Sequence, residues 1–246
     1  MTSPAQFKPA PRNRLLAALP PEDLARLWPR LEPVELRLRQ VLHPPETPIT
    51  EIYFPETGWV SMIILFEDGD SAEVGMIGHE GMVGLPVLLR SDRYDLEAMV
   101  QAPGTALRLS SAAFREEFDG NRAFRDLMLN YALAHYSHVA RTAACNSSHH
   151  IEQRLARFLL LVHDLVDGDT YPMTHEFLSV LLGIRRAGVT AAAGAMQKAG
   201  LIRYGAGRIT IADRLGLENA TCECYDATRR ALDRVFGRDR PDAGKA

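Results

Sequence analysis

The pattern of apolar and polar positions changes character along the chain. Leucines at helical spacing fill residues 13–28, and Pro20 and Pro21 interrupt them. From residue 31 to 109 the pattern becomes short alternating runs separated by glycines, which predicts strands. The clearest runs are 34–38, 52–54, 60–66, 72–77, 97–101 and 106–109. Asp68 and Gly69 between two of them predict a hairpin. Many short strands with glycine turns indicate a β-barrel or jelly-roll-like body.

The chain turns helical at Ser110 and stays so. Ser110 or Ser111 can cap a short helix that ends near Gly120, and Asn121 can cap a long helix that ends near Asn146. Seven residues of the long helix follow the 4-3 spacing of a heptad seam. They are Phe124, Met128, Tyr131, His135, His138, Thr142 and Cys145. We expect this seam to join two copies of the chain; in the alternative it packs against the chain's own barrel.

Residues 174–211 have the pattern of a helix-turn-helix followed by a hairpin. Thr174 can cap a first helix, Gly183 can end it, and a second helix begins near Arg185. A third helical segment and an alternating run about the turn at residues 205–207 complete the pattern. The spacing therefore predicts a winged helix-turn-helix, whose second helix would enter the DNA major groove by its N-terminal end. In the alternative interpretation, these residues form a small helical core element whose surface arginines have no DNA-binding role.

Charge favours the DNA-binding interpretation. Residues 174–211 hold five basic residues and one acidic residue, whereas residues 1–150 hold 14 basic and 19 acidic residues. Positive charge is thus concentrated on the unit that would meet phosphates. We expect contacts to base edges or phosphates from the second helix, to a phosphate from the start of the first helix, and to the backbone from the wing. These contacts would come from Arg185, Arg186, Val189 and Thr190, from Thr174 and His175, and from Arg203 and Arg208, respectively.

A β-rich body, a long helix, a hinge and a winged helix-turn-helix, in that order, resemble the Crp/Fnr family of bacterial transcription regulators. The resemblance covers about residues 13–215 and is strongest at residues 78–84 and 174–211. It implies an α+β fold with a double-stranded β-roll of the cyclic-nucleotide-binding type at 13–120. A dimerisation helix and hinge at 121–147 and a winged helix-turn-helix domain at 148–236 would follow. It also implies a homodimer that binds a double-stranded DNA operator and contacts RNA polymerase.

The sequence departs from this family at two places. Cyclic-AMP-responsive members hold the cyclic phosphate with an Arg-Ser or Arg-Thr pair, which corresponds here to Leu96 and Glu97. A carboxylate repels a phosphate, so we expect no response to cyclic AMP. An effector pocket, for an effector that the sequence does not identify, would involve Gly84, Leu85, Arg93 and Glu97. Of the family's Arg-Glu-x-x-x-Arg reader only Arg186 is kept, which predicts a different operator.

The remaining residues suggest no catalytic chemistry. The roll offers only His43 and His79 as metal ligands, so we expect no enzyme, no metal and no cofactor. Cys222 and Cys224 lie two apart in a predicted helix and would point in different directions, which disfavours joint metal binding with Cys145. No signal peptide and no membrane-spanning run is apparent, and we expect a cytoplasmic protein. The rival interpretation is a small-molecule or redox sensor that acts mainly through protein contacts.

Overall fold

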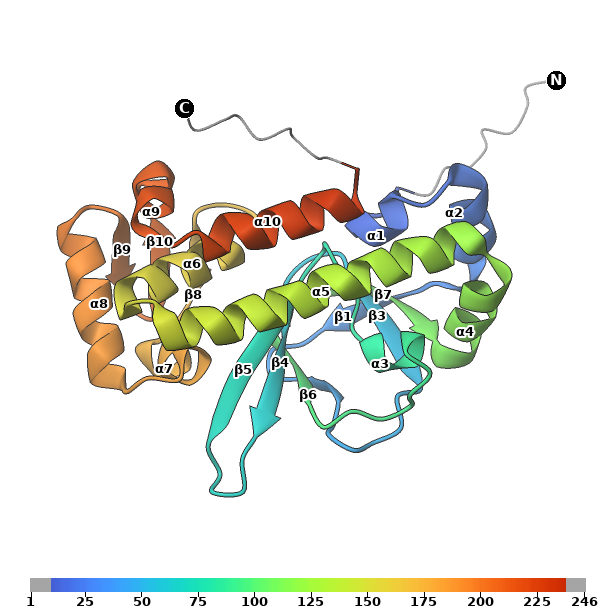
Figure 1. Ribbon diagram of the computed structural model, residues 1–246, viewed down its shortest axis with the longest axis horizontal. Coiled ribbons are helices and arrows are strands. Elements are labelled where there is room, and N and C mark those ends of the chain that lie inside the picture. The colour runs from blue at the N-terminus through green and yellow to red at the C-terminus, as the bar shows by residue number, and fades with distance from the viewer. Residues whose placement is uncertain (1–9, 238–246) are drawn as a thin grey trace.

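The computed structural model describes residues 10–237, and in it a β-roll and a smaller helical unit are joined by one long helix (Figure 1). The helical entry to the roll is α1 (Arg14–Ala17), α2 (Pro21–Leu27) and a 3-10 turn (Trp28–Arg30). The strands of the roll are β1 (Glu32–Leu36), β2 (Val41–His43), β3 (Glu51–Pro55), β4 (Trp59–Leu65), β5 (Ser71–Ile77), β6 (Glu97–Ala102) and β7 (Gly104–Ser110). Helix α3 (Leu85–Leu88) interrupts them, and α4 (Ser111–Gly120) follows them.

The roll consists of two antiparallel sheets. Their strand orders are β1-β7-β3 and β2-β6-β4-β5. Alternate side chains such as Tyr53, Val60 and Val100 share one buried cluster between the sheets. The six strands expected from the alternating pattern are confirmed, while the short β2 was missed because its three residues give no period to detect.

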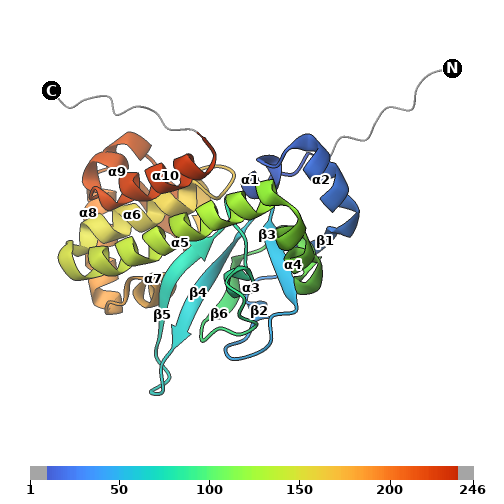
Figure 2. The same cartoon turned by 45° about the vertical axis from the view of Figure 1, so that its right-hand side comes forward.

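Helix α5 (Arg122–Ser148) lies across the roll, as the long green-yellow helix of Figures 1 and 2. Asn121 caps it as expected, because its side chain accepts a hydrogen bond from the Phe124 N–H at 3.2 Å. The predicted dimer seam, however, packs inside one chain: Phe124, Met128 and Tyr131 are buried against the roll, and Cys145 is buried against Cys222 and Cys224. A Cβ on Gly81 would come within 2.2 Å of the Tyr131 hydroxyl oxygen, which shows how closely the roll approaches α5.

The assignment of this seam to a dimer is therefore wrong. The alternative, packing against the barrel, is confirmed for Phe124, Met128 and Tyr131, whereas Thr142 and Cys145 contact the C-terminal unit. The opposite face of α5 instead exposes Leu129, Leu133 and Tyr136, with 46%, 65% and 70% of their surface accessible. These three residues, which we call the outer stripe, also follow 4-3 spacing. An apolar stripe of this spacing on a solvent-facing helix is typical of a helix that pairs with another.

The C-terminal unit contains α6 (Ile151–His163), β8 (Thr170–Pro172), α7 (His175–Leu182), α8 (Arg186–Lys198), β9 (Ile202–Gly205), β10 (Arg208–Ile211), α9 (Arg214–Ala220) and α10 (Cys224–Val235). Its own core includes Leu159, Tyr171, Leu178 and Ile209. The prediction of a third, separate helical segment before the wing is wrong, because α8 runs without a break to Lys198. The wing gains a strand that the sequence did not suggest: β8 pairs with β10 in the order β8-β10-β9.

Helix α10 returns along α5 toward the roll (Figures 1 and 2). At its far end the Arg14 guanidinium lies 4.0 Å from the centroid of the Phe236 ring. At its near end residues 221–223 separate it from α9, so Cys222 lies before the helix that Cys224 begins. The two thiols can therefore face the same place, and the expectation that they diverge is wrong.

In the part of the chain that the structure describes, no single helix is long and apolar enough to cross a membrane. Helices α7 and α8 together have the length and apolar composition of a membrane span, but the pair is bent by 108°.

Candidate nucleic-acid interface

Helices α7 and α8 form the expected helix-turn-helix. The Thr174 hydroxyl accepts a hydrogen bond from the Phe177 N–H at 3.1 Å, which caps the start of α7. Gly183 ends α7 with φ of 59°, a left-handed conformation that glycine adopts without a Cβ clash. The 108° bend then brings Arg185 and Arg186 to the leading end of α8.

Four arginines make this surface positive. Arg185 and Arg186 are exposed at the start of α8, while Arg203 and Arg208 are exposed on the strands of the wing. None of the four forms an ion pair with a residue in the described range 10–237. Within those residues, Arg208 is the only one of the four whose guanidinium donates a hydrogen bond to the protein, to the Thr170 carbonyl at 3.4 Å. The charge of this surface is therefore left for an external anion.

His175, the first residue of α7, contacts both α8 and the wing. Its ring stacks on that of Tyr204 from the wing at 4.1 Å, and its Nδ1 lies 3.0 Å from the Thr190 hydroxyl of α8. Burial and the nearby charge of Arg186 lower the pKa of His175, which favours the neutral ring. His175 thus holds α7, α8 and β9 in register. Tyr204 was missed from the sequence, where it is one more aromatic residue in a short strand.

The outward face of α8 differs from the expectation at one position. Val189 is fully buried in the core, so the groove contact expected from it is wrong. Thr190 is exposed as expected, and beside it lie the exposed small residues Ala187, Ala191 and Gly194. Apolar groups such as an alanine methyl can contact thymine methyls in a major groove.

An acidic hairpin lies near this surface. Asp68 and Asp70, at the tip between β4 and β5, line the same open cleft as Arg185 and Gly183. Helix α7 also contacts β5. A duplex placed along α8 would therefore meet the carboxylates of the roll as well as the arginines.

The cavity beside Gly84 and Leu85 in the roll is almost filled. It has a volume of about 10 Å³, because His43, Tyr94 and His135 fill it. Arg93 and Glu97 do not line this cavity, so the structure brings together two of the four residues expected for an effector pocket. Arg93 is exposed beside Asp92, and Glu97 begins β6, where burial raises the pKa of its carboxyl group.

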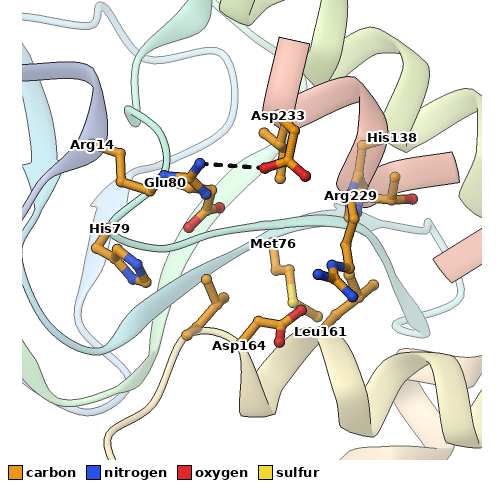
Figure 3. Close-up of a pocket in the computed structure, with 12 residues that line it drawn as sticks. Arg14, Met76, His79, Glu80, His138, Leu161, Asp164, Arg229 and Asp233 are labelled. Carbon is orange, nitrogen blue, oxygen red and sulfur yellow. Dashed lines mark ion pairs between the residues drawn. The ribbon is translucent and has the colours of Figure 1, made fainter. Parts of the chain in front are cut away.

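A larger cavity, of about 280 Å³, lies between the roll, α6 and α10. Figure 3 shows Glu80 and Arg229 on opposite sides of it, with the ion pair between Arg14 and Asp233, 3.6 Å apart, at its edge. One carboxylate oxygen of Glu80 is buried without a hydrogen-bond partner in the described chain, and burial raises the pKa of this group. The junction of the two units thus leaves more space for a small molecule than the cavity beside Gly84 and Leu85 does.

Comparison with protein families identifies both units. The model of the cyclic nucleotide-binding domain matches residues 33–121, and that of the Crp-like helix-turn-helix domain matches residues 153–220. The chain belongs to the Crp/Fnr family. It is a Crp/Fnr-type transcription regulator, and the α+β architecture with an N-terminal roll, a long helix and a winged helix-turn-helix is confirmed.

Solved structures of the family share this fold. FixK2 from Bradyrhizobium japonicum is 16% identical with a TM-score of 0.68, and the match covers 78% of this chain and 98% of that one. A CRP-family regulator from Thermus thermophilus is 18% identical with a TM-score of 0.64, over 76% and 95% of the two chains. The c-di-GMP-responsive regulator CLP from Xanthomonas campestris is 18% identical with a TM-score of 0.60, over 78% and 99%. No curated protein matches the sequence. At such identities the likeness extends to the fold alone.

Proposed function

We propose that the protein is a homodimeric regulator that binds a specific DNA sequence and does not respond to cyclic AMP. The observation that carries the proposal is the set of four exposed arginines, Arg185, Arg186, Arg203 and Arg208, without an acidic partner in the described chain. Elsewhere arginines such as Arg108 and Arg214 have carboxylates within 3 Å. Unpaired positive charge at the start of a recognition helix and on its wing suits the phosphates and guanine edges of a duplex.

The outer stripe supports the dimer. Leu129, Leu133 and Tyr136 are large, apolar and exposed at heptad spacing on α5. A second copy pairing along α5 by a two-fold axis would bury all three residues on both chains. Such pairing would present two copies of α8 to successive turns of the duplex. Contact with RNA polymerase, which the family resemblance implies, stays a prediction.

The small cavity in the roll supports the absence of a cyclic-AMP response. Pockets for small ligands have volumes of about 300–1,000 Å³, whereas the cavity beside Gly84 and Leu85 has about 10 Å³. Leu96 and Glu97 also stand where cyclic-AMP-responsive members of the family hold the cyclic phosphate with an Arg-Ser or Arg-Thr pair. Calorimetric titration with cyclic AMP should therefore give no saturable heat, and saturable micromolar binding would refute this part of the proposal.

The main test is selection of bound fragments from the genomic DNA of the native host by the purified full-length protein. A palindrome with half-sites about one helical turn apart is expected, and binding to it should weaken steeply with salt. Arg186→Ala should cost about 1–3 kcal/mol per protomer and relax the preference at one base pair. Arg208→Ala should weaken all sequences alike and lower the salt slope by about one.

Arg90→Ala is the matched control, because Arg90 is an exposed arginine of the roll that pairs with Asp119. Its removal should leave both the operator and the salt slope unchanged. Fragments without a shared motif, bound equally at all salt concentrations, would contradict the proposed function.

A further inference from the structure

Three cysteines and one histidine converge at the hinge between α5 and α6. Cys145 and His149 come from the end of α5, Cys222 comes from the break before α10, and Cys224 is the first residue of α10. Their four ligand atoms, three sulfurs and one ring nitrogen, all lie within 4.8 Å of one another. All three cysteines are buried, and His149 is half-buried.

Two of the distances between these atoms are those of a tetrahedral metal site. The sulfurs of Cys145 and Cys222 are 3.6 Å apart, and the Cys224 sulfur is 3.7 Å from His149 Nδ1. Zinc binds sulfur at about 2.3 Å and imidazole nitrogen at about 2.0–2.1 Å, so tetrahedral angles require edges of about 3.5–3.8 Å. We propose that Cys145, His149, Cys222 and Cys224 bind a single zinc ion.

The other side of the His149 ring supports this assignment. Its Nε2 lies 3.4 Å from a carboxylate oxygen of Glu223. In zinc proteins the ligating histidine commonly donates its second N–H to a carboxylate, which fixes the ring orientation and the tautomer. Here Nδ1 faces the thiols while Nε2 faces Glu223, which is the orientation that zinc binding needs.

A buried arginine balances the charge. Three thiolates and one zinc ion leave a net charge of −1, and the Arg157 guanidinium is close enough to all three cysteines to interact with them electrostatically. Arg157 is 5% exposed, and its Nε has no hydrogen-bond partner in the described chain, although its Nη2 donates to the Thr142 hydroxyl at 2.8 Å. A negatively charged thiolate site would give this buried cation its counter-charge.

The ion would fasten α10 to the end of α5. Because α10 runs back along α5, zinc at this point would fix the hinge between the roll and the helix-turn-helix. The consequence for DNA binding, a lower operator affinity after zinc removal, rests on the proposed function. The metal site itself does not, since it is tested by metal content without DNA.

The test is metal analysis of the full-length protein, expressed with added zinc and purified under reducing, oxygen-free conditions. Roughly one zinc per protomer is expected, as in structural sites with four protein ligands. Replacement by cobalt(II) should give the intense visible bands of a tetrahedral thiolate site. Cys224→Ser and His149→Gln should lose most of the metal, whereas His150→Gln, the same change at the adjacent exposed histidine, should retain it.

Glu223→Gln covers the case in which a ligand variant fails to fold. Glu223 is exposed and is not a ligand, so its change should leave the fold intact and weaken zinc about 10–100-fold in a chelator competition. Protein that contains three free thiols and no metal would overturn the proposal. A Cys145–Cys222 disulfide in the purified protein, or iron together with inorganic sulfide, would overturn it as well.

Discussion

The two long faces of α5 have the same heptad spacing but opposite surroundings. The inner face, represented by Met128 and Tyr131, is buried against the roll of its own chain, with at most 2% exposed. The outer stripe, Leu129, Leu133 and Tyr136, lies open to solvent. The inner face therefore contributes to folding of one chain, whereas the outer stripe is available for assembly of two. The spacing of apolar residues shows that a helix face packs against something. It does not show whether that face packs against the same chain or against a second copy.

Leu133→Asp should have the largest effect, because it should abolish dimerisation through the outer stripe and leave the fold of each chain unchanged. In the proposed dimer it removes a buried leucine from both chains, which costs about 1.5–3 kcal/mol per residue, or about 3–6 kcal/mol per dimer. The dimer dissociation constant should rise at least about 100-fold, as measured by sedimentation equilibrium. Circular dichroism of the resulting monomer should be unchanged, because Leu133 is 65% exposed within one chain.

Leu38→Asp is the matched control, since Leu38 is a leucine of the roll that is 59% exposed. It should change neither assembly nor fold. A Leu133→Asp protein that still sediments as a dimer would show that the outer stripe is not the dimer interface.

Met128→Ala probes the inner face. Its side chain is fully buried, and truncation of such a methionine costs about 2–5 kcal/mol in the free energy of unfolding. Denaturant titration in the Leu133→Asp background, where assembly no longer contributes, should show this loss. Leu129→Ala, the next residue on the helix, should change stability there by less than about 0.5 kcal/mol. Equal losses for the two variants would contradict the division of α5 into an inner and an outer face.

The features that depend on a few neighbouring residues could be predicted from the sequence. The caps at Ser110, Asn121 and Thr174 are examples, because each side chain accepts a hydrogen bond from an N–H three residues later. The helix stop at Gly183 has the same local origin. The exposed arginines at the start of α8 follow from those boundaries.

The features that depend on distant parts of the chain could not be predicted from the sequence. Val189 lies on a helix with alanines on several sides, so only the packing of α8 shows that its side chain is inside. The helix break at residues 221–223 contains neither glycine nor proline, and the convergence of Cys222 and Cys224 with Cys145 depends on it. In the same way, the choice of face on α5 required the position of the roll.

His135→Leu should give the smallest effect, a change in the pH dependence of stability. Burial of the inner face lowers the pKa of His135 from 6.5 to about 4. Between these pH values the unfolded chain binds a proton at His135 that the folded chain does not bind. The contribution of neutral His135 to the free energy of unfolding is therefore complete above pH 6.5 and is lost as the pH falls toward 4. Its slope is at most about 1.4 kcal/mol per pH unit. Relative to the parent, the variant should thus gain about 1–2 kcal/mol of stability as the pH falls from 6.5 to 5.

The quantity to measure is the difference in unfolding free energy between variant and parent at each pH, because other buried groups of this region also titrate. Burial and Arg157 lower the pKa of His138, which acts in the same direction as His135. Burial raises the pKa of Glu73 on β5 to about 8, and its contribution is complete below pH 4.5 and is lost as the pH rises through 8. These opposing slopes partly cancel in the parent but are common to both proteins. Parallel stability curves for His135→Leu and the parent would mean that water reaches the inner face of α5 and leaves His135 able to take up a proton in the folded chain.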